Sequence, residues 1–507
     1  MAVHHRRDFL RRSLAALAGS AAFAALPAKM ALAQGASLRQ LRGAGIDYRA
    51  LVCIYLYGGN DCFNMVVPTD TGATPIDPGR SYGAYAATRT NLAIPVAQLR
   101  ALAPVQPPSG GAPYGLHPEM EGLAQLFNAQ RAAIVANVGP LVRPVNKTTY
   151  QQPGTPLPPQ LFSHSDQSVV WQSPRADSIA RTGWGGRLAD VFFASNANPT
   201  LSMNVSLAGE NVFQAGESVL PYFMSASGVE RINMIETGAA NCADGGQGWN
   251  RRRCLTFNAL QDATYAHPFQ RAYAQRLRAT RETSRMVEVA LATVPRNDPV
   301  FQPFWTAFGL QWNATDPPAL PDLGEQLLMI ARMIRARTTL QMSRQLFFAG
   351  IGGFDTHDYQ LNDHGPLLRQ ISAGLKGFYD VLAQPSMALT QQVTAFTASE
   401  FGRTLSNNGD GTDHGWGGHH VVVGGAVNGG RIYGRMPNVS GNPAQNPDDA
   451  GWGQIIPTLA VDQYAATLAT WFGLSAEDRA AIFPNLQYMT GPMLSIPGSD
   501  LGFMQAV

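Results

Sequence analysis

The segment Gln345–Ala398 decides the fold, because it alternates between two structural patterns. It opens with QLFFAG at residues 345–350, an apolar run typical of a strand buried on both faces of a sheet. Apolar residues at helical spacing follow from Leu367 to Leu382, and VTAFTA at residues 393–398 is a second apolar run. Strand, helix and strand in this order predict a βαβ unit. We therefore expect an α/β protein with a mostly parallel sheet.

Other apolar runs extend this pattern along the chain. Residues 51–57 and 132–138 predict further buried strands, and the region from Leu201 to Phe223 is rich in β-forming residues. A chain of 507 residues can form one large domain or two ordinary ones. We expect a single domain over residues 34–507, with a β-rich insertion at about residues 200–256.

The N-terminus has the pattern of an export signal. HRRDFL at residues 5–10 contains two adjacent arginines, an alanine-rich apolar run follows from Leu14 to Leu26, and Ala31-Leu32-Ala33 is a small-residue cleavage site. The alternative is an ordinary amphipathic helix. The pattern predicts a signal peptide at residues 1–33, the twin-arginine translocase as an export partner, and a periplasmic or secreted mature protein. No other apolar run is long enough for a stable transmembrane anchor.

Charge and cysteine content narrow the function further. The formal net charge is +2, and residues 1–33 carry five basic side chains and one acidic one, which leaves about −2 for the mature chain. This balance argues against nucleic acid as a partner. In an oxidising compartment, Cys242 and Cys254 are expected to form a loop disulfide. Cys53 and Cys62 either pair or are small buried apolar residues, and the sequence favours the second interpretation.

Carboxylates and imidazoles follow the predicted strands in glycine-rich loops, and both groups are ligands for divalent metals. The loops could bind one metal ion or two, and the ion could be zinc, manganese, calcium or magnesium. The alternatives are that Asp61 bonds only to its own turn and that the histidines serve packing. The expected metal ligands are Asp61, Asp355, His357, Glu400, Asp413 and His414. The groups expected to support them are Asn64, His164, Arg403, His419 and His420, of which the last two could instead simply lead into the strand that follows.

A candidate nucleophile lies at the start of a predicted helix. Ser163 and Ser165 flank His164 there, where a hydroxyl can act as a helix cap or as a nucleophile that uses the helix N-terminus to hold an anion. The sequence contains no G-x-S-x-G, H-E-x-x-H, Walker A or G-x-G-x-x-G motif, which disfavours serine hydrolases, zincins and nucleotide-dependent enzymes.

Together these motifs resemble a family of exported bacterial proteins, the domain-of-unknown-function family 1501. The resemblance rests on GGND at 58–61, SH at 163–164, FDTH at 354–357, SEFGRT at 399–404 and TDHGWGG at 412–418. That family in turn resembles the alkaline phosphatase and sulfatase superfamily, which implies a three-layer α/β sandwich with a mostly parallel central sheet. It also implies Ser163 as the nucleophile, with Ser165 as the second choice.

The chain departs from that superfamily at two points. Phe401 stands where the superfamily usually has a histidine, and no cysteine has the surroundings of a sulfatase formylglycine site. The leading hypothesis is a metal-dependent hydrolase of phosphate or sulfate esters, with a small molecule or a glycan ester as substrate. The alternative is a catalytically degenerate relative that binds an anionic or carbohydrate ligand or acts in envelope assembly. A purely structural envelope protein is the third possibility.

Overall fold

A nine-stranded sheet forms the centre of the protein. The computed structural model describes residues 47–231 and 249–506. The order of strands across the sheet is β13-β5-β12-β9-β1-β8-β6-β7, and β14 pairs with β5. The strands are β1 (Arg49–Leu56), β5 (Ala132–Gly139), β6 (Asn204–Ser206), β7 (Tyr222–Phe223), β8 (Arg344–Ile351), β9 (Val393–Ala398), β12 (Gly418–Gly424), β13 (Arg431–Tyr433) and β14 (Leu459–Ala460).

The sheet is mostly parallel, which confirms the predicted α/β class. β1 pairs in parallel with β8 on one side and with β9 on the other, whereas β12 runs antiparallel to both β9 and β5. All six residues of β9 are buried, as are seven of the eight in β1. Burial of both faces explains why these strands are nearly continuous apolar runs instead of alternating ones.

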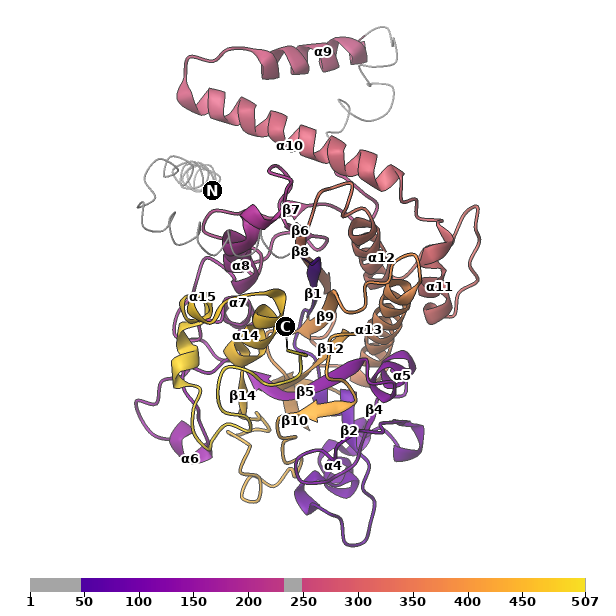
Figure 1. The fold of residues 1–507 in the computed structure, drawn as a ribbon. Helices are drawn as coiled ribbons and strands as arrows, with labels where there is room; N and C mark the ends of the chain where they lie inside the picture. The colour runs from indigo at the N-terminus through magenta and orange to yellow at the C-terminus, as the bar shows by residue number, and fades with distance from the viewer. Residues whose placement is uncertain (1–46, 232–248, 507) are drawn as a thin grey trace. The chain divides into compact units, whose positions relative to one another are not determined.

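Helices lie on both sides of this sheet in Figure 1. α12 contacts β8, α13 contacts β12, and α14 contacts β1 and β5. One group is α5 (Glu121–Asn128), α11 (Gln302–Phe308), α12 (Asp322–Arg335) and α13 (Gln360–Ala383). The other is α7 (His164–Gln172), α8 (Trp184–Phe192), α14 (Val461–Phe472) and α15 (Ala476–Ile482). Smaller elements beside the sheet include α3 (Cys62–Met65), α4 (Tyr82–Arg89) and the antiparallel pair β10 (Arg403–Asn407) and β11 (Thr412–His414).

The middle of the chain differs from the expectation. Contacts divide the chain into two compact units, and one of them contains residues 197–201 and 229–290. The region expected to be a β-rich insertion instead adds β6 and β7 to the edge of the main sheet, and α9 begins at Trp249. The two helices that follow are α9 (Trp249–Asp262) and α10 (Pro268–Ala292). Pro268 lacks the N–H that a continuous helix needs, and it begins α10.

The cysteines and the N-terminus are described only in part. Cys53 and Cys62 are free and buried, as the sequence favours. Cys254 is disulfide-bonded, whereas Cys242 lies outside the described residues. The predicted signal peptide at residues 1–33 also lies outside them. Among the helices that the structure describes, none is long and apolar enough to cross a membrane.

Candidate functional site

Three loops with ligand-type side chains meet at one edge of the sheet. They follow β9, β1 and β8, which are adjacent parallel strands, so their carboxyl ends open toward the same side. The loops touch closely at Gly58, whose φ is +116° and where a Cβ atom would lie 2.3 Å from the backbone nitrogen of Asp355. Only glycine fits such a contact. The loop after β8 carries Asp355 and His357, and the loop after β9 carries Glu400.

Two further histidines reach this edge from other elements. His414 is the last residue of β11, which pairs with β10 directly after the Glu400 loop. His164 is the first residue of α7, and Phe162 before that helix has a φ of +72°. The structure thus adds His164, expected only as a supporting residue, to the ligand-type side chains themselves.

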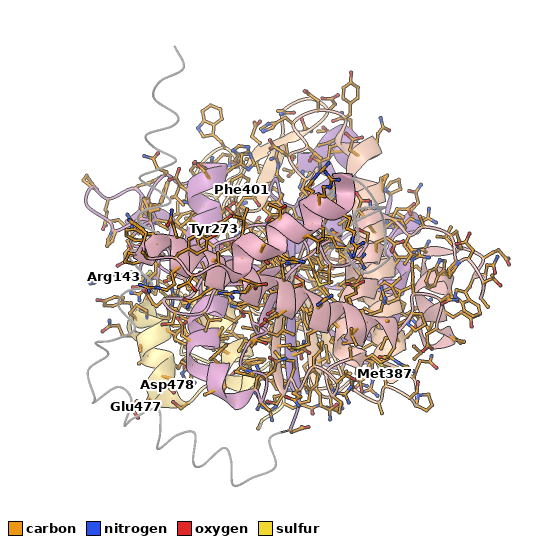
Figure 2. All side chains as sticks on the ribbon, turned by 90° about the horizontal axis from the view of Figure 1, so that it is seen from above. Arg143, Tyr273, Met387, Phe401, Glu477 and Asp478 are labelled. Atoms are coloured by element: carbon orange, nitrogen blue, oxygen red, sulfur yellow. The ribbon has the colours of Figure 1, made fainter. Side chains whose placement is uncertain are left out.

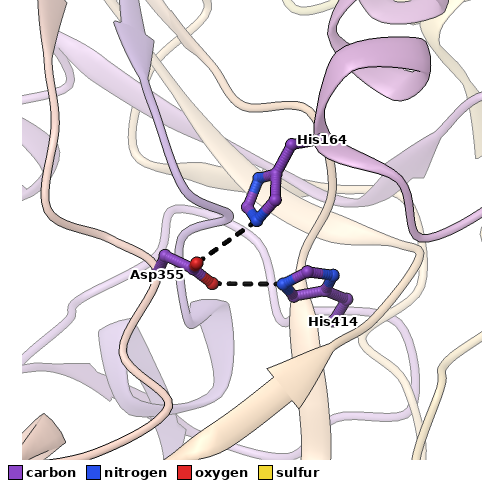
Figure 3. Close-up of side chains that lie close together, drawn as sticks. All are labelled: His164, Asp355 and His414. Atoms are coloured by element: carbon purple, nitrogen blue, oxygen red, sulfur yellow. Dashed lines mark hydrogen bonds and ion pairs between the residues drawn. The ribbon is translucent and has the colours of Figure 1, made fainter.

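Asp355 lies at the centre of the cluster (Figure 3). Its Oδ2 atom is 3.3 Å from His164 Nε2, and its Oδ1 atom is 3.1 Å from His414 Nε2. Ligand atoms of these three residues all lie within 4.8 Å of one another, a spacing that could hold a metal ion. His357 Nε2 approaches the same Oδ1 atom at 3.0 Å and lies 3.0 Å from His414 Nε2.

The other nitrogen of each imidazole bonds to an oxygen acceptor. His164 Nδ1 lies 3.0 Å from Glu400 Oε1, and His357 Nδ1 lies 3.0 Å from Asp413 Oδ1. His414 Nδ1 lies 2.7 Å from the carbonyl oxygen of Phe162. A carbonyl oxygen and an ionised carboxylate can only accept hydrogen bonds, so each Nδ1 is the donor.

The Nε2 atoms of all three imidazoles lie beside one carboxylate. A neutral imidazole that donates from Nδ1 carries a lone pair on Nε2, and the three Nε2 atoms converge on Asp355. A proton on Nε2 gives such a ring an ion pair with Asp355, and a divalent cation in place of the protons would bind the same nitrogens. An outer carboxylate or carbonyl that fixes each imidazole is also the usual arrangement behind metal-bound histidines. The residues present therefore fit a divalent metal ion.

Arg403 supplies a permanent positive charge beside this cluster. Its side chain is fully buried, and Nη1 lies 2.5 Å from Asp355 Oδ1 and 3.1 Å from the carbonyl oxygen of Gly58. Its Nε and Nη2 atoms bond to the hydroxyl and carbonyl groups of Thr412. Burial acts to raise the pKa of Asp355, but Arg403, His164 and His357 outweigh it and the pKa is lowered. Asp355 is thus held as the anionic carboxylate that a metal ligand must be.

The pKa values of two of the imidazoles are shifted in opposite directions. The hydrogen bond with Glu400 raises the pKa of His164, which is partly exposed. Burial lowers the pKa of His414, against the Phe162 carbonyl and Asp355, and the Arg403 charge adds to the lowering. Phe401 stacks on the His414 ring at 4.6 Å and lies 4.9 Å from the His164 ring. Phe401 (labelled in Figure 2) therefore packs against the imidazoles of His164 and His414.

Asp61 lies outside the cluster of Nε2 atoms. Its buried carboxylate pairs with Arg89 of α4, accepts from Gln360 and caps α3 through Phe63 N at 3.1 Å. Asp61 therefore bonds within its own turn, as the alternative in the sequence analysis states, and both of its carboxylate oxygens contact protein groups. Asn64 is also buried, donating to the Leu92 carbonyl and accepting from the Tyr85 hydroxyl.

Glu400 and Asp413 each accept a hydrogen bond from the Nδ1 atom of an imidazole in the cluster. Glu400 Oε1 accepts from Gly58 N at 2.7 Å as well as from His164, and Asp413 accepts from His357. Both were expected as ligands, and the structure instead places each behind an imidazole. Sequence spacing does not reveal this pairing, because His164 and Glu400 lie 236 residues apart.

The serines lie beside the cluster, at the start of α7. Ser163 Oγ makes no capping bond but donates to Asp166 Oδ2 at 2.6 Å, and Ser165 Oγ lies 3.3 Å from Ser163 Oγ. The Ser163 backbone carbonyl accepts from Gln167 N, so the helix still begins there. The Ser163 hydroxyl is thus paired with a carboxylate that can accept its proton.

A family described as "Protein of unknown function (DUF1501)" matches residues 48–451, which span the strand-end loops and the β10–β11 hairpin. The chain belongs to the DUF1501 family. No curated protein matches it.

His419 and His420 of the DUF1501 chain are packing residues of β12. His419 accepts from Asn137 N through Nδ1 at 3.0 Å and makes an edge contact with Phe63. His420 packs edge-on against Trp171 at 4.8 Å. Both were expected to support the metal ligands, and both are instead buried within the sheet, as the alternative interpretation of this stretch implies.

Buried histidines predict acid sensitivity of the DUF1501 fold. Burial lowers the pKa of His117, His364 and His419 to about 4 and that of His420 to about 3. Unfolded histidines titrate near 6.5, so only the unfolded chain takes up these protons between about pH 6.5 and 4. Each histidine then removes about 1.4 kcal/mol of unfolding free energy per pH unit in that window. Buried Asp462, whose pKa is raised to about 8, has the opposite effect: it holds a proton in the folded protein and so offsets the destabilisation from one of the four histidines.

We therefore expect the free energy of unfolding to fall by several kcal/mol between pH 7 and pH 5. Urea titrations at both pH values, each with a chelator present so that metal binding does not contribute, measure this difference. An unfolding free energy that stays constant or rises at pH 5 would contradict the assignment of these histidines as buried and neutral.

Glu400→Gln tests the support of His164. The amide keeps the size of the side chain but loses the charge that favours an Nδ1 proton, so we expect metal affinity to fall about 10–100-fold. Competition with a chromophoric chelator measures the affinity. Asp358→Asn is the matched control, because Asp358 is an exposed acid beside His357 with no side-chain partner among the described residues. Equal affinity in the two variants would rule out the supporting role.

Proposed function

We propose that this DUF1501 member is an exported, metal-dependent hydrolase of phosphate or sulfate esters. The observation that carries the proposal is the convergence of three imidazole Nε2 atoms on Asp355, with every Nδ1 bonded to an acceptor. The four side chains remain partly exposed, so a substrate can reach them from solvent. A catalytic metal site combines protein ligands with such an open position.

We assign one metal ion to this site instead of two. The ligand-type residues at this edge would suffice for two ions, but Arg89 and Gln360 occupy Asp61, and Gly58 N and His164 occupy Glu400. Arg403 already neutralises part of the charge on Asp355. A donor set of three imidazoles and one carboxylate favours zinc or a similar transition metal over calcium or magnesium, which prefer oxygen ligands.

The chain's own groups divide the catalytic work around that ion. When bound, the metal polarises an ester oxygen and stabilises the negative charge that develops on it. Glu400, Asp413 and the Phe162 carbonyl orient the three imidazoles. Asp166 is placed to accept the proton of Ser163 as the Ser163 oxygen attacks the phosphorus or sulfur atom and the bond to the ester's alcohol oxygen breaks. The alcohol leaves with that proton, and water then cleaves the ester on Ser163, which releases phosphate or sulfate and restores the serine hydroxyl.

The remaining expectations belong to the same proposal. We propose that the sheet and its helices correspond to the three-layer sandwich of the alkaline phosphatase superfamily, with Ser163 in the place of its nucleophile. Support comes from the metal-type loops at adjacent strand ends and from the serine at a helix start. Export through the twin-arginine route and a periplasmic or secreted location remain part of the proposal.

Ser163→Ala tests the catalytic assignment. In the mature protein loaded with zinc or manganese, we expect hydrolysis of 4-nitrophenyl phosphate or 4-nitrophenyl sulfate, and we expect the substitution to lower kcat at least about 100-fold because the nucleophile is lost. Metal content should stay unchanged, because Ser163 is not a ligand. Ser165→Ala is the matched control. Absence of turnover of every phospho- and sulfo-ester by the metal-loaded protein would reject the hydrolase.

A second function, ligand binding without turnover, is favoured by one observation. Phe401 stands in the position of a superfamily histidine and fills it with an apolar ring against His414. A protein of this kind would hold a metal and an anionic or carbohydrate ligand, or take part in envelope assembly. Stoichiometric metal combined with no turnover, and full cellular function of Ser163→Ala, would select this second function.

A further inference from the structure

An exposed tryptophan lies in a turn that is hydrogen-bonded to His414 and to β10. Trp452 has an exposed fraction of 88%, the highest of any large hydrophobic side chain in the part of the chain that the structure describes. Its φ of +59° lies in the left-handed region, which a bulky residue rarely adopts. Water contact and backbone strain both cost free energy, and neither is offset by packing. Strain of this kind concentrates at functional sites.

The turn that carries Trp452 is rigidly held. Asp449 Oδ1 accepts from Gly451 N at 2.8 Å and from Gly453 N at 3.0 Å, so one carboxylate fixes the residues on both sides of the ring. Gln454 N also donates to the Gly451 carbonyl at 3.0 Å. Holding an exposed ring in one orientation lowers the entropy cost of binding a ligand against it.

Hydrogen bonds tie this turn to the site. Leu405 N on β10 donates to the Gly453 carbonyl at 2.8 Å, and Gln454 Nε2 donates to the His414 carbonyl at 3.3 Å. A second exposed aromatic residue, Tyr359, follows His357 by two positions and also has a left-handed φ, of +52°. Its exposed fraction is 68%. Two left-handed, solvent-facing aromatic residues therefore lie in the turn that is hydrogen-bonded to His414 and in the loop that carries His357.

We propose that Trp452, with Tyr359, stacks against sugar rings, so that the substrate of this site is an esterified glycan. This inference rests on the proposed function for the chemistry and adds the substrate class. The flat C–H face of a pyranose covers one indole ring, whereas its hydroxyls need polar neighbours. Between residues 362 and 492, Trp452 is the only large hydrophobic side chain that is exposed. A protein partner would instead need an interface of about 800 Å² on this chain.

Binding of three probes to the mature, metal-loaded protein tests this proposal. The probes are a sulfated dextran oligosaccharide, the same oligosaccharide without sulfate, and inorganic sulfate, titrated by calorimetry. Loss of one ring face against a sugar, roughly 60 Å² of apolar contact, should weaken binding about 10-fold. We expect Trp452→Ala to lower the affinity for the sulfated oligosaccharide by this factor and to leave the affinity for inorganic sulfate unchanged. Trp452→Phe should keep most of the affinity for the oligosaccharide.

Controls separate this inference from the proposed hydrolase. Tyr273→Ala on α10, which has the same exposed fraction as Tyr359, should not change oligosaccharide affinity. The proposal would be overturned if Trp452→Ala left the oligosaccharide affinity unchanged, or if it lowered the affinity for inorganic sulfate equally. A wild-type protein that binds neither oligosaccharide would also overturn it. Oligosaccharide binding that depends on Trp452, in a protein without ester turnover, would support the glycan site while rejecting the hydrolase.

Discussion

Asp355→Ala/His414→Ala is expected to lose stoichiometric metal. Asp355 contacts all three imidazoles, and His414 Nε2 lies 3.1 Å from Asp355 Oδ1 and 3.0 Å from His357 Nε2. Loss of an outer partner of a ligand already costs about 10–100-fold in affinity, so loss of two ligands should cost at least about 10⁴-fold. Ester hydrolysis should fall with it. Elemental analysis after dialysis, and chelator competition, measure the two effects.

The control for this variant changes the same residue types elsewhere. Asp358→Ala/His267→Ala removes an exposed aspartate and an exposed histidine that are not part of the cluster. It should retain one equivalent of metal per chain. Circular dichroism of all three proteins must show the same helix and strand content. If the cluster variant retained the metal of the wild type, the ligand assignment would be wrong.

Arg89→Met is expected to destabilise the fold by about 3–5 kcal/mol, the cost of breaking a buried ion pair by removing one partner. Arg89 and Asp61 are both fully buried and paired. Burial acts to raise the pKa of Asp61, yet Arg89, His364 and the hydrogen bonds lower it, so the carboxylate is ionised. Without Arg89, that charge remains in the core with Gln360 and a backbone N–H as its main partners. Urea unfolding at pH 7 measures the loss.

A solvent-exposed pair provides the comparison. Arg100 and Glu121 form an ion pair 3.2 Å apart in which both side chains are about half exposed. Arg100→Met should change the unfolding free energy by less than about 1 kcal/mol, as is usual for surface pairs. An Arg89→Met effect as small as that of Arg100→Met would show that Asp61 has another partner, such as a metal ion.

Much of the fold could be predicted because burial on both faces leaves a strong local signal. The apolar run Val393–Ala398 is β9, and the residues at helical spacing from Leu367 to Leu382 lie in α13. The direction of β12 could not be predicted, since an apolar strand has the same composition whether it runs parallel or antiparallel. The break between α9 and α10 had a local signal at Pro268 that the helical periodicity obscured.

Only the part of the site that lies in the loops after strands could be predicted from the sequence. Asp355 and His357 follow β8 and Glu400 follows β9, the two parallel strands that flank β1, so topology alone brings them to one edge. The roles within that edge depend on distant partners. Glu400 bonds to His164, and Asp61 pairs with Arg89 from α4. No spacing rule predicts which carboxylate meets an arginine and which meets an imidazole, because tertiary contacts decide it.

X-ray absorption spectroscopy at the zinc edge, on the mature protein loaded with one equivalent of zinc, tests the metal centre most directly. We predict a first shell of nitrogen and oxygen at about 2.0–2.1 Å, with the outer-shell scattering of three imidazoles. That imidazole scattering should be lost in Asp355→Ala/His414→Ala. A shell of oxygen alone, sulfur ligands, or zinc that washes out of the wild-type protein would contradict a centre built from His164, His357, His414 and Asp355.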